Sequence, residues 1–186
     1  QLERGIDYVR RRHRAERFIA YFSDYTTTHA DPPALASLYR AALAHPDVVG
    51  LALATRPDCL PEPVMDLLAE LARETWLSVE LGVQTASDAS LERVARGHRV
   101  ADSRRAIRSL RARGIPVTAH VIIGLPGEER AEVLATADLV TRERVDAIKL
   151  HNLHVVEGTR LAEAYRAGRL KVLSPEQYVD LAVAFL

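Results

Sequence analysis

The chain has 186 residues, with 25 lysines and arginines against 25 aspartates and glutamates, and 48% of its residues are hydrophobic. This profile fits one globular domain and excludes a disordered chain, and no apolar run approaches the roughly 18 residues of a membrane-spanning helix. A single cysteine, Cys59, excludes an internal disulfide and a cysteine-only metal or iron–sulfur site built from these residues alone.

Apolar, β-branched runs alternate with helical patterns along the chain. We predict strands over residues 17–23, 48–55, 76–83, 115–123 and 146–153. We predict helices over residues 1–13, 61–74, 88–96, 102–113, 128–144 and 159–168, and two more that begin at Asp31–Pro32 and at Ser174–Pro175. Gly97 and Gly114 are expected to end the helices before them, because glycine readily adopts the left-handed conformation of a helix C-cap.

Strands that are each followed by a helix predict an α/β fold. The runs 48–55 and 115–123 are nearly continuously apolar, which is typical of parallel strands covered on both faces. No G-x-G-x-x-G turn follows the first strand, so a dinucleotide-binding sheet is disfavoured. We therefore predict a partial TIM-like barrel, as a single domain over residues 1–186, with its site at the carboxyl ends of the strands.

Arginine dominates the basic residues and concentrates in residues 1–17 and 86–114, whereas the only lysines are Lys149 and Lys171. Arginine suits recognition of phosphate and carboxylate groups. The two segments are either solvated helix faces or a nucleic-acid-binding surface. Few aromatic residues interleave with these arginines, which favours solvated faces.

The first two predicted strands end in polar loops. The loop DYTTTH carries hydroxyls at residues 26–28, which either form part of a site or cap the next helix. In TRPDC, Arg56 can hold a ligand carboxylate or pair with Asp58. We interpret Cys59 as a small buried side chain rather than a nucleophile.

The segment ELGVQT carries a carboxylate and an amide along one strand. By alternation, Glu80, Gly82, Gln84 and Ala86 share one face. A carboxylate inside a barrel needs polar partners, so a structural network is the alternative to a binding role for Glu80.

The last two strands bring histidines and glycines. His120 precedes a Gly–Leu–Pro–Gly turn, in which Gly124 allows positive φ or close approach of a ligand. His151 and His154 are three residues apart in extended chain and point to opposite faces, so we expect no metal site.

Taken in order, the motifs TRPD, ELGVQT, RGH, HVIIGLPGE and LHNLHVVEGTRL resemble the radical S-adenosylmethionine (SAM) superfamily. The resemblance is to the branch of the Elongator catalytic subunit and the oxygen-independent coproporphyrinogen oxidases, and within it to an uncharacterised bacterial family. It implies a partial (β/α)6 barrel and a 4Fe–4S cluster on a C-x3-C-x2-C loop after the first strand. It also implies reductive cleavage of SAM to a 5′-deoxyadenosyl radical that abstracts hydrogen from a substrate.

The same resemblance implies roles for particular residues. Gln84 matches a residue that contacts the cofactor, and Arg96 matches the arginine that binds the methionine carboxylate. His120 stands where relatives carry an acidic ribose ligand. Ile122 and Gly124 lie in the stretch whose backbone pairs with adenine. No ligand of the cofactor amino group is assigned, because SDYTTT replaces the usual Gly–Gly–Glu-like motif.

The cysteine motif has no counterpart here, and the chain neither starts with methionine nor caps its last helix. We therefore expect a piece of a longer cytoplasmic protein, inactive alone, that lacks the first strand and cluster loop. The full-length protein would draw electrons from a flavodoxin or ferredoxin, and an RNA base is one candidate substrate. Two alternatives are a cluster-free barrel that binds a nucleoside or RNA through its arginines, and an aldolase or isomerase that uses Lys149.

Overall fold

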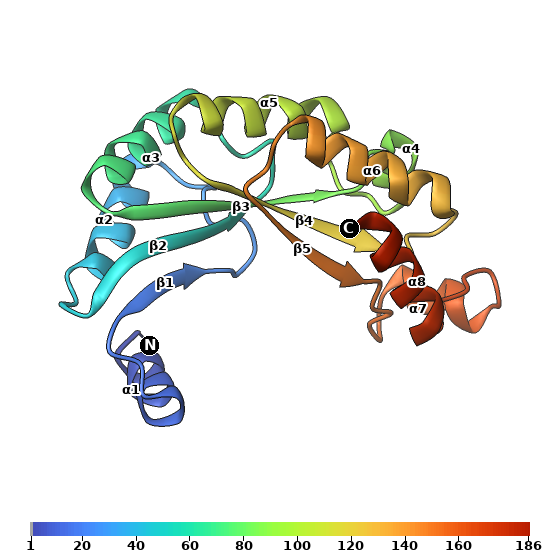
Figure 1. Cartoon of the computed structure of the whole chain (residues 1–186), viewed down its shortest axis with the longest axis horizontal. Helices are drawn as coiled ribbons and strands as arrows, with labels where there is room; N and C mark the ends of the chain where they lie inside the picture. Colours follow the sequence, from blue (N-terminus) through green and yellow to red (C-terminus); the bar gives the residue numbers. More distant parts are fainter. Residues whose placement is uncertain (1) are drawn as a thin grey trace.

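The computed structural model describes residues 2–186 and contains one sheet of five parallel strands (Figure 1). The strands are β1 (Phe18–Phe22), β2 (Val48–Thr55), β3 (Trp76–Gln84), β4 (Val117–Ile123) and β5 (Ala147–Asn152). Each strand pairs with the next one in the sequence, and the sheet curls into half a barrel. The predicted α/β fold, a partial TIM-like barrel, is therefore confirmed.

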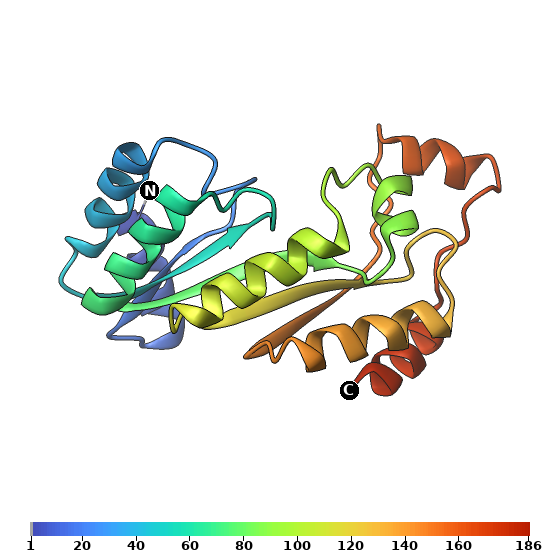
Figure 2. The same cartoon turned by 90° about the horizontal axis from the view of Figure 1, so that it is seen from above.

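Helices cover the convex face of this half-barrel. The long ones are α1 (Leu2–His13), α2 (Pro32–Leu43), α3 (Glu62–Glu74), α5 (Val100–Ala112), α6 (Arg130–Arg142) and α8 (Pro175–Phe185). Helices α2, α3, α5 and α6 follow one another around the outside, and α8 packs against α6 (Figure 1). The short helices α4 (Asp88–Arg93) and α7 (Arg160–Arg166) lie side by side beyond the strand ends (Figure 2). None of the helices within residues 2–186 is long and apolar enough to cross a membrane.

Strand β4 shows how the sequence sets the two faces of the sheet. Val117, Ala119, Val121 and Ile123 are buried, and the three residues between them are half-buried on the concave face. The buried row meets the apolar sides of the outer helices in one hydrophobic core. Because side chains alternate along a strand, the polar members of β4 are left to face the barrel interior.

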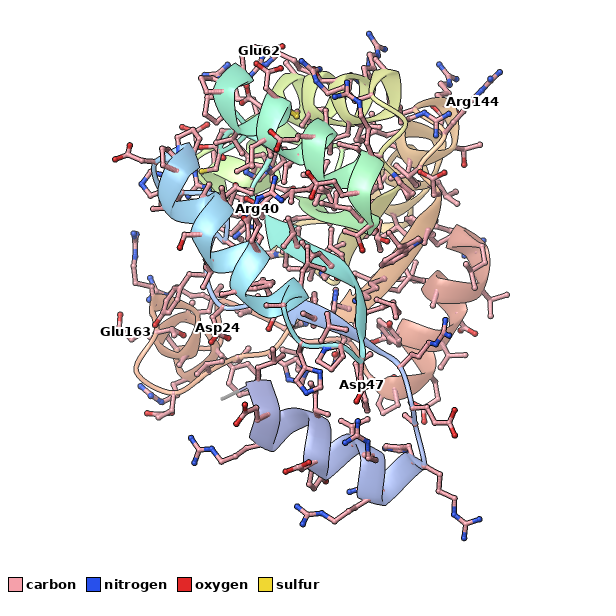
Figure 3. The ribbon with its side chains drawn as sticks, turned by 90° about the vertical axis from the view of Figure 1, so that its left-hand side faces the viewer. Asp24, Arg40, Asp47, Glu62, Arg144 and Glu163 are labelled. Carbon is pink, nitrogen blue, oxygen red and sulfur yellow. The ribbon has the colours of Figure 1, made fainter. Side chains whose placement is uncertain are left out.

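Ion pairs fasten the outer helices to their neighbours. Arg40 of α2 contacts two glutamates of α3, with 2.7 Å from its Nη1 to the Oε2 of Glu74 (Figure 3). Asp47, which precedes β2, pairs with Arg10 of α1, and the buried Ile6 anchors the same helix. These ion pairs stabilise the outside of the half-barrel, and they leave the concave face free for a functional site.

Several helix boundaries differ from expectation by two or three residues: α6 begins at Arg130 rather than at residue 128, α7 ends at Arg166 rather than at residue 168, and two others have an identifiable cause. The helix expected to reach residue 96 ends at Arg93, and Ala95, with φ of 52°, is the left-handed residue that follows it. The helix expected to start at Asp102 starts two residues earlier, because the Asp102 carboxylate accepts the backbone N–H of Arg99 at 2.8 Å as a capping group. Gly114, with φ of 70°, follows α5 as expected.

Candidate active site at the strand ends

The threonine loop after β1 is fastened to the end of β2. The Thr27 hydroxyl donates to the carbonyl of Ala54, and the Thr28 hydroxyl lies 2.5 Å from that of Thr55 and 2.6 Å from the carbonyl of Cys59. Of the two alternatives for these hydroxyls, the helix cap is excluded, because Thr27 and Thr28 bind the end of β2 and the turn after it, and no side chain caps the first turn of α2. The loop therefore fixes the position of the TRPDC turn.

Within that turn, Arg56 pairs with Asp58. The guanidinium donates two hydrogen bonds, of 2.9 and 2.6 Å, to the two carboxylate oxygens. These bonds are the main cause of the lowered pKa of Asp58. Cys59 is half-buried, and desolvation raises the pKa of its thiol, which suits packing rather than nucleophilic attack.

The carboxyl end of β3 contains a bulge. Leu81 lies opposite Ala119, but the next pair joins Gln84 to Val121, so β3 holds one more residue than β4 at this point. Gln84 is buried and has a φ of 69°. Strict alternation therefore stops before Gln84, and the bulge re-aims its side chain.

The bulge and the turn after α4 bring Gln84 and Arg96 together over Gly82. A Cβ atom on Gly82 would lie 2.7 Å from the Gln84 Nε2 and 2.3 Å from the Arg96 Nη2. Only glycine leaves room for both side chains at this point. Two of the residues predicted to bind the cofactor thus lie side by side at the mouth of the half-barrel.

Arg96 is a half-buried cation whose buried Nε has no hydrogen-bond partner among residues 2–186. Desolvation lowers the pKa of its guanidinium, and the positive charge of Arg56 lowers it further. A buried charge without a counter-ion is costly, whereas a carboxylate would supply both the charge and the acceptors. The guanidinium of Arg96 is therefore chemically suited to bind a carboxylate.

Gly97 and His98 complete the turn behind Arg96. Gly97, with φ of 78°, is not a helix cap; a Cβ there would lie 2.8 Å from the Nη2 of Arg56. His98 is only 6% exposed, and neither ring nitrogen makes a hydrogen bond within the described chain. Burial and then the charge of Arg96 lower the pKa of this histidine, so its ring is neutral at pH 7.

A second cluster of polar groups crosses the concave face around Glu80. Its carboxylate accepts hydrogen bonds from the Tyr21 hydroxyl at 2.8 Å, the His120 Nε2 at 2.8 Å and the Lys149 Nζ at 2.6 Å. The Nδ1 of His120 in turn lies 3.1 Å from the Nε2 of His151. The structure therefore contains the polar network that the sequence left open as the alternative for Glu80.

The charges of this network are complementary. Burial alone would raise the pKa of Glu80, but the hydrogen bonds from Lys149, His120 and Tyr21 outweigh it and lower that pKa. Burial likewise opposes the charged form of Lys149, but Glu80 outweighs it and raises the pKa of the lysine. An aldolase lysine needs a lowered pKa to be nucleophilic, so this ion pair argues against the lysine-enzyme alternative.

The remaining predicted residues lie on β4 and in the turn after it. Ile122 is half-buried opposite His151 in the strand register, on the same face as His120. Gly124 has a φ of 92°, and a Cβ there would lie 2.9 Å from the Cδ1 of Leu173. The glycine thus admits the Leu173 side chain against the strand end, beside a cavity of about 430 Å³.

Sequence reasoning missed Tyr21 and the role of Gly82. Tyr21 follows the buried Ala20 in β1, so alternation along that strand already places the tyrosine on the concave face. The role of Gly82 could not be predicted from its own position in the sequence, because it depends on the side chains of residues 84 and 96, which lie over it.

The arginines of α5 mostly face carboxylates. Each of its four arginines lies within 4.0 Å of a carboxylate: Arg104 and Arg108 of Glu143, Arg105 of Asp102, and Arg111 of Asp146. Their pairing agrees with solvated helix faces rather than with a nucleic-acid-binding surface along this helix.

Within residues 2–186 no group of three or more His, Cys, Asp or Glu side chains could hold a metal ion, so these residues do not fit an iron–sulfur cluster.

Comparison with known proteins identifies the family. Residues 1–140 match the radical SAM superfamily, and residues 145–186 match the radical SAM C-terminal domain. The chain belongs to the radical SAM superfamily. Enzymes of this superfamily use SAM and a 4Fe–4S cluster.

Relatives include both uncharacterised proteins and RNA-modifying enzymes. Over 168 residues the chain is 47% identical to Protein YhcC of Escherichia coli K12. The aligned region covers 89% of this chain and 54% of that protein. Over 140 residues it is 31% identical to a tRNA uridine(34) acetyltransferase of Methanocaldococcus jannaschii, covering 72% of this chain and 25% of that enzyme. The chain spans about half the length of the curated relatives it matches first.

Solved structures share the fold. The Elp3 protein of Methanocaldococcus infernus superposes with a TM-score of 0.83 at 20% identity, covering 99% of this chain and 48% of that chain. The coproporphyrinogen III oxidase HemN of Escherichia coli gives 0.69 at 18% identity, covering 89% and 38%. The resemblance inferred from the strand-end motifs is therefore confirmed.

Proposed function

We propose that this chain forms the SAM-binding part of a radical SAM enzyme, with Arg96 on the cofactor carboxylate and Gln84 beside it. The observation that carries the proposal is the Arg96 guanidinium, whose Nε is buried and unpartnered within residues 2–186 and which lies over Gly82 next to the Gln84 amide. Guanidinium–carboxylate pairs are among the strongest charge-assisted hydrogen bonds, and an amide offers both a donor and an acceptor.

Strand β4 would hold the nucleoside end. We assign the backbone from Ile122 to Gly124 to the adenine and the His120 ring to the ribose. Both nitrogens of His120 are already engaged, by Glu80 and by His151. His120 can therefore bind a ribose hydroxyl only after its Nδ1 releases His151, whereas its bond to the charged Glu80 is retained.

With SAM and a 4Fe–4S cluster bound, the site would have the radical chemistry needed for hydrogen abstraction from a substrate. The cluster ligands would come from outside residues 2–186, and electrons from a flavodoxin- or ferredoxin-type reductant. The residues of this chain orient the cofactor and keep a charged, hydrogen-bonded wall, centred on Glu80, along the barrel interior.

For the substrate we propose an RNA base. Support comes from the relatives that are named tRNA uridine(34) acetyltransferases and are 31–36% identical over 124–140 residues. The cluster-free binding module remains the contrasting hypothesis, and it predicts RNA binding without SAM cleavage.

The test uses the full-length protein, reconstituted with iron and sulfide under anaerobic conditions. We expect formation of 5′-deoxyadenosine with a strong reductant. Arg96→Gln should weaken SAM binding at least about tenfold, because it removes a charged hydrogen-bonding partner worth about 1.5–3 kcal/mol. Arg105→Gln, which removes an exposed arginine of α5, is the matched control. Equal SAM affinity in the two variants would overturn the assignment of Arg96.

A further inference from the structure

A second pocket lies at the same rim but outside the cofactor site. It has a volume of about 490 Å³ and lies between the end of α4, the turn after β4 and helix α7. Figure 2 shows α4 and α7 standing together beyond the strand ends. Three of the lining residues are arginines, namely Arg93, Arg160 and Arg169.

The charge of this pocket is unbalanced. Glu163 is the one acidic residue among those that line it, and it belongs to α7 (Figure 3). Among the salt bridges of residues 2–186, none involves Arg93, Arg160 or Arg169, whereas Arg166 of the same helix pairs with Glu157. The pocket thus presents a local excess of positive charge that the protein does not neutralise.

Arg93 is held in place before any ligand arrives. Its Nη1 donates to the carbonyl of Pro126, and a Cβ on Gly127 would lie 2.4 Å from the same nitrogen. A guanidinium fixed in this way loses less side-chain entropy on binding than a free one. Arg93, Arg160 and Arg169 are exposed, so their guanidinium groups are accessible to a ligand from solution, and the pocket wall between them includes Leu161 and Leu170.

One turn joins this pocket to the cofactor site. Arg93 and Arg96 are separated by Val94 and by Ala95, whose left-handed conformation reverses the chain. Arg96 consequently reaches over Gly82, while Arg93 reaches Pro126 on the other side of the turn. A polymer that occupied the arginine pocket would run past the mouth of the half-barrel.

We propose that this pocket binds a backbone phosphate of an RNA substrate. The inference rests on the proposed function, in which an RNA base is the target. Arginine forks bind phosphate oxygens in pairs, and several unpaired arginines beside one carboxylate favour an anion over a cation or a neutral ligand. A free nucleotide or inorganic phosphate carries the same chemistry, and the experiment separates these sources.

The experiment measures binding of a fluorescently labelled, unmodified tRNA transcript to the full-length protein by anisotropy at several salt concentrations. The test variant is Arg160→Gln/Arg169→Gln, which spares the hydrogen bond from Arg93 to the turn. Arg166→Gln, on the same helix but paired with Glu157, is the matched control. We expect the double variant to bind tRNA about fivefold or more weakly. The slope of log K against log salt should fall by about 0.7–0.9 for each phosphate that the variant no longer neutralises.

Equal affinity and slope in the double variant and the control would overturn the RNA site. A second arm titrates inorganic phosphate and AMP. If these anions bind in the wild type and not in the double variant, while tRNA affinity is the same in both, the pocket takes free anions and the proposal is overturned. SAM cleavage without RNA is measured on the same samples, because it reports on the proposed function and should be equal in all three proteins.

Discussion

The guanidinium of Arg96 crosses directly over Gly82, at a distance that no side chain at position 82 would allow. Arg96 comes from the turn after α4, and Gly82 comes from the last residues of β3. The strand, the bulge and the turn together hold this half-buried cation at the mouth of the half-barrel, with its Nε buried and unpartnered within residues 2–186.

Substitution of Gly82 should disable this arrangement without unfolding the protein. In Gly82→Ala the new methyl group would lie 2.3 Å from the Arg96 Nη2 and must displace that flexible side chain. We expect SAM affinity, measured by isothermal titration, to fall at least about tenfold, the equivalent of one charged hydrogen-bonding partner. Gly5→Ala is the control, because nothing lies within 4 Å of its added Cβ. A similar affinity in both variants would show that Arg96 does not hold the cofactor.

The network on the concave face should contribute to stability. Glu80→Gln removes the negative charge that pairs with Lys149 and that accepts hydrogen bonds from Tyr21 and His120. We expect the free energy of unfolding, from urea titration at pH 7, to fall by about 1–3 kcal/mol. Tyr21→Phe, which deletes a single donor, should cost less, and a larger loss than for Glu80→Gln would contradict this view of the network.

The same pair of proteins gives a pH test. Because the folded-state pKa of Glu80 is lowered, its stabilisation is fully present above the unfolded value near 4.5 and is lost as the pH falls through the folded value. The difference in unfolding free energy between wild type and Glu80→Gln should therefore shrink below about pH 4.5. A constant difference from pH 7 to pH 3 would mean that the Glu80 charge is not what stabilises the fold.

Much of the fold follows from local patterns, because the strands are rich in apolar residues and several helices begin with a proline or a capping serine. The runs predicted at 48–55 and 76–83 match β2 and β3 to within a residue. The end of α4 was missed because the chain leaves the helix early to let Arg96 reach Gly82. This contact between distant residues cannot be predicted from the sequence of α4 alone.

The site could be predicted only in part, for the same reason. Gln84 and Arg96 could be named from the order of motifs, yet their meeting depends on a bulge that shifts the register between β3 and β4. The hydrogen bonds of Glu80 with Tyr21 and Lys149 span 59 and 69 residues. Interactions of that range depend on strand register and barrel curvature, which no single segment specifies.

His98 offers a test of an unsatisfied buried group. The ring is 6% exposed and neither nitrogen has a partner within residues 2–186, so it contributes polar atoms without their hydrogen bonds. His98→Leu should leave the free energy of unfolding at pH 7 unchanged or raise it by up to about 1 kcal/mol. A loss of several kcal/mol, measured by urea titration, would show that the ring makes a hydrogen bond essential to the fold.

The pH dependence should change in the same variant. Because burial lowers the folded-state pKa of His98, the unfolded chain takes up the proton first as the pH drops below about 6.5. The wild type should consequently lose stability between pH 7 and pH 5. His98→Leu should lose less, although His151, whose pKa burial also lowers, acts in the same direction in both proteins.

A double-mutant cycle can separate two costs at the turn after β4. Gly124→Ala meets a clash, because its Cβ would lie 2.9 Å from the Leu173 Cδ1, and it also places alanine at a φ of 92°. The strain at positive φ should cost about 1–2 kcal/mol, and overpacking should add a further 1–3 kcal/mol. Leu173 is half-buried, so Leu173→Ala on its own should cost about 1–2 kcal/mol in lost packing. In the double variant the clash disappears but the backbone strain does not. The decreases in unfolding free energy of the two single variants should therefore sum to more than the decrease in the double variant. If the losses in the free energy of unfolding are strictly additive, glycine is needed at position 124 only for its backbone conformation, and not to make room for Leu173.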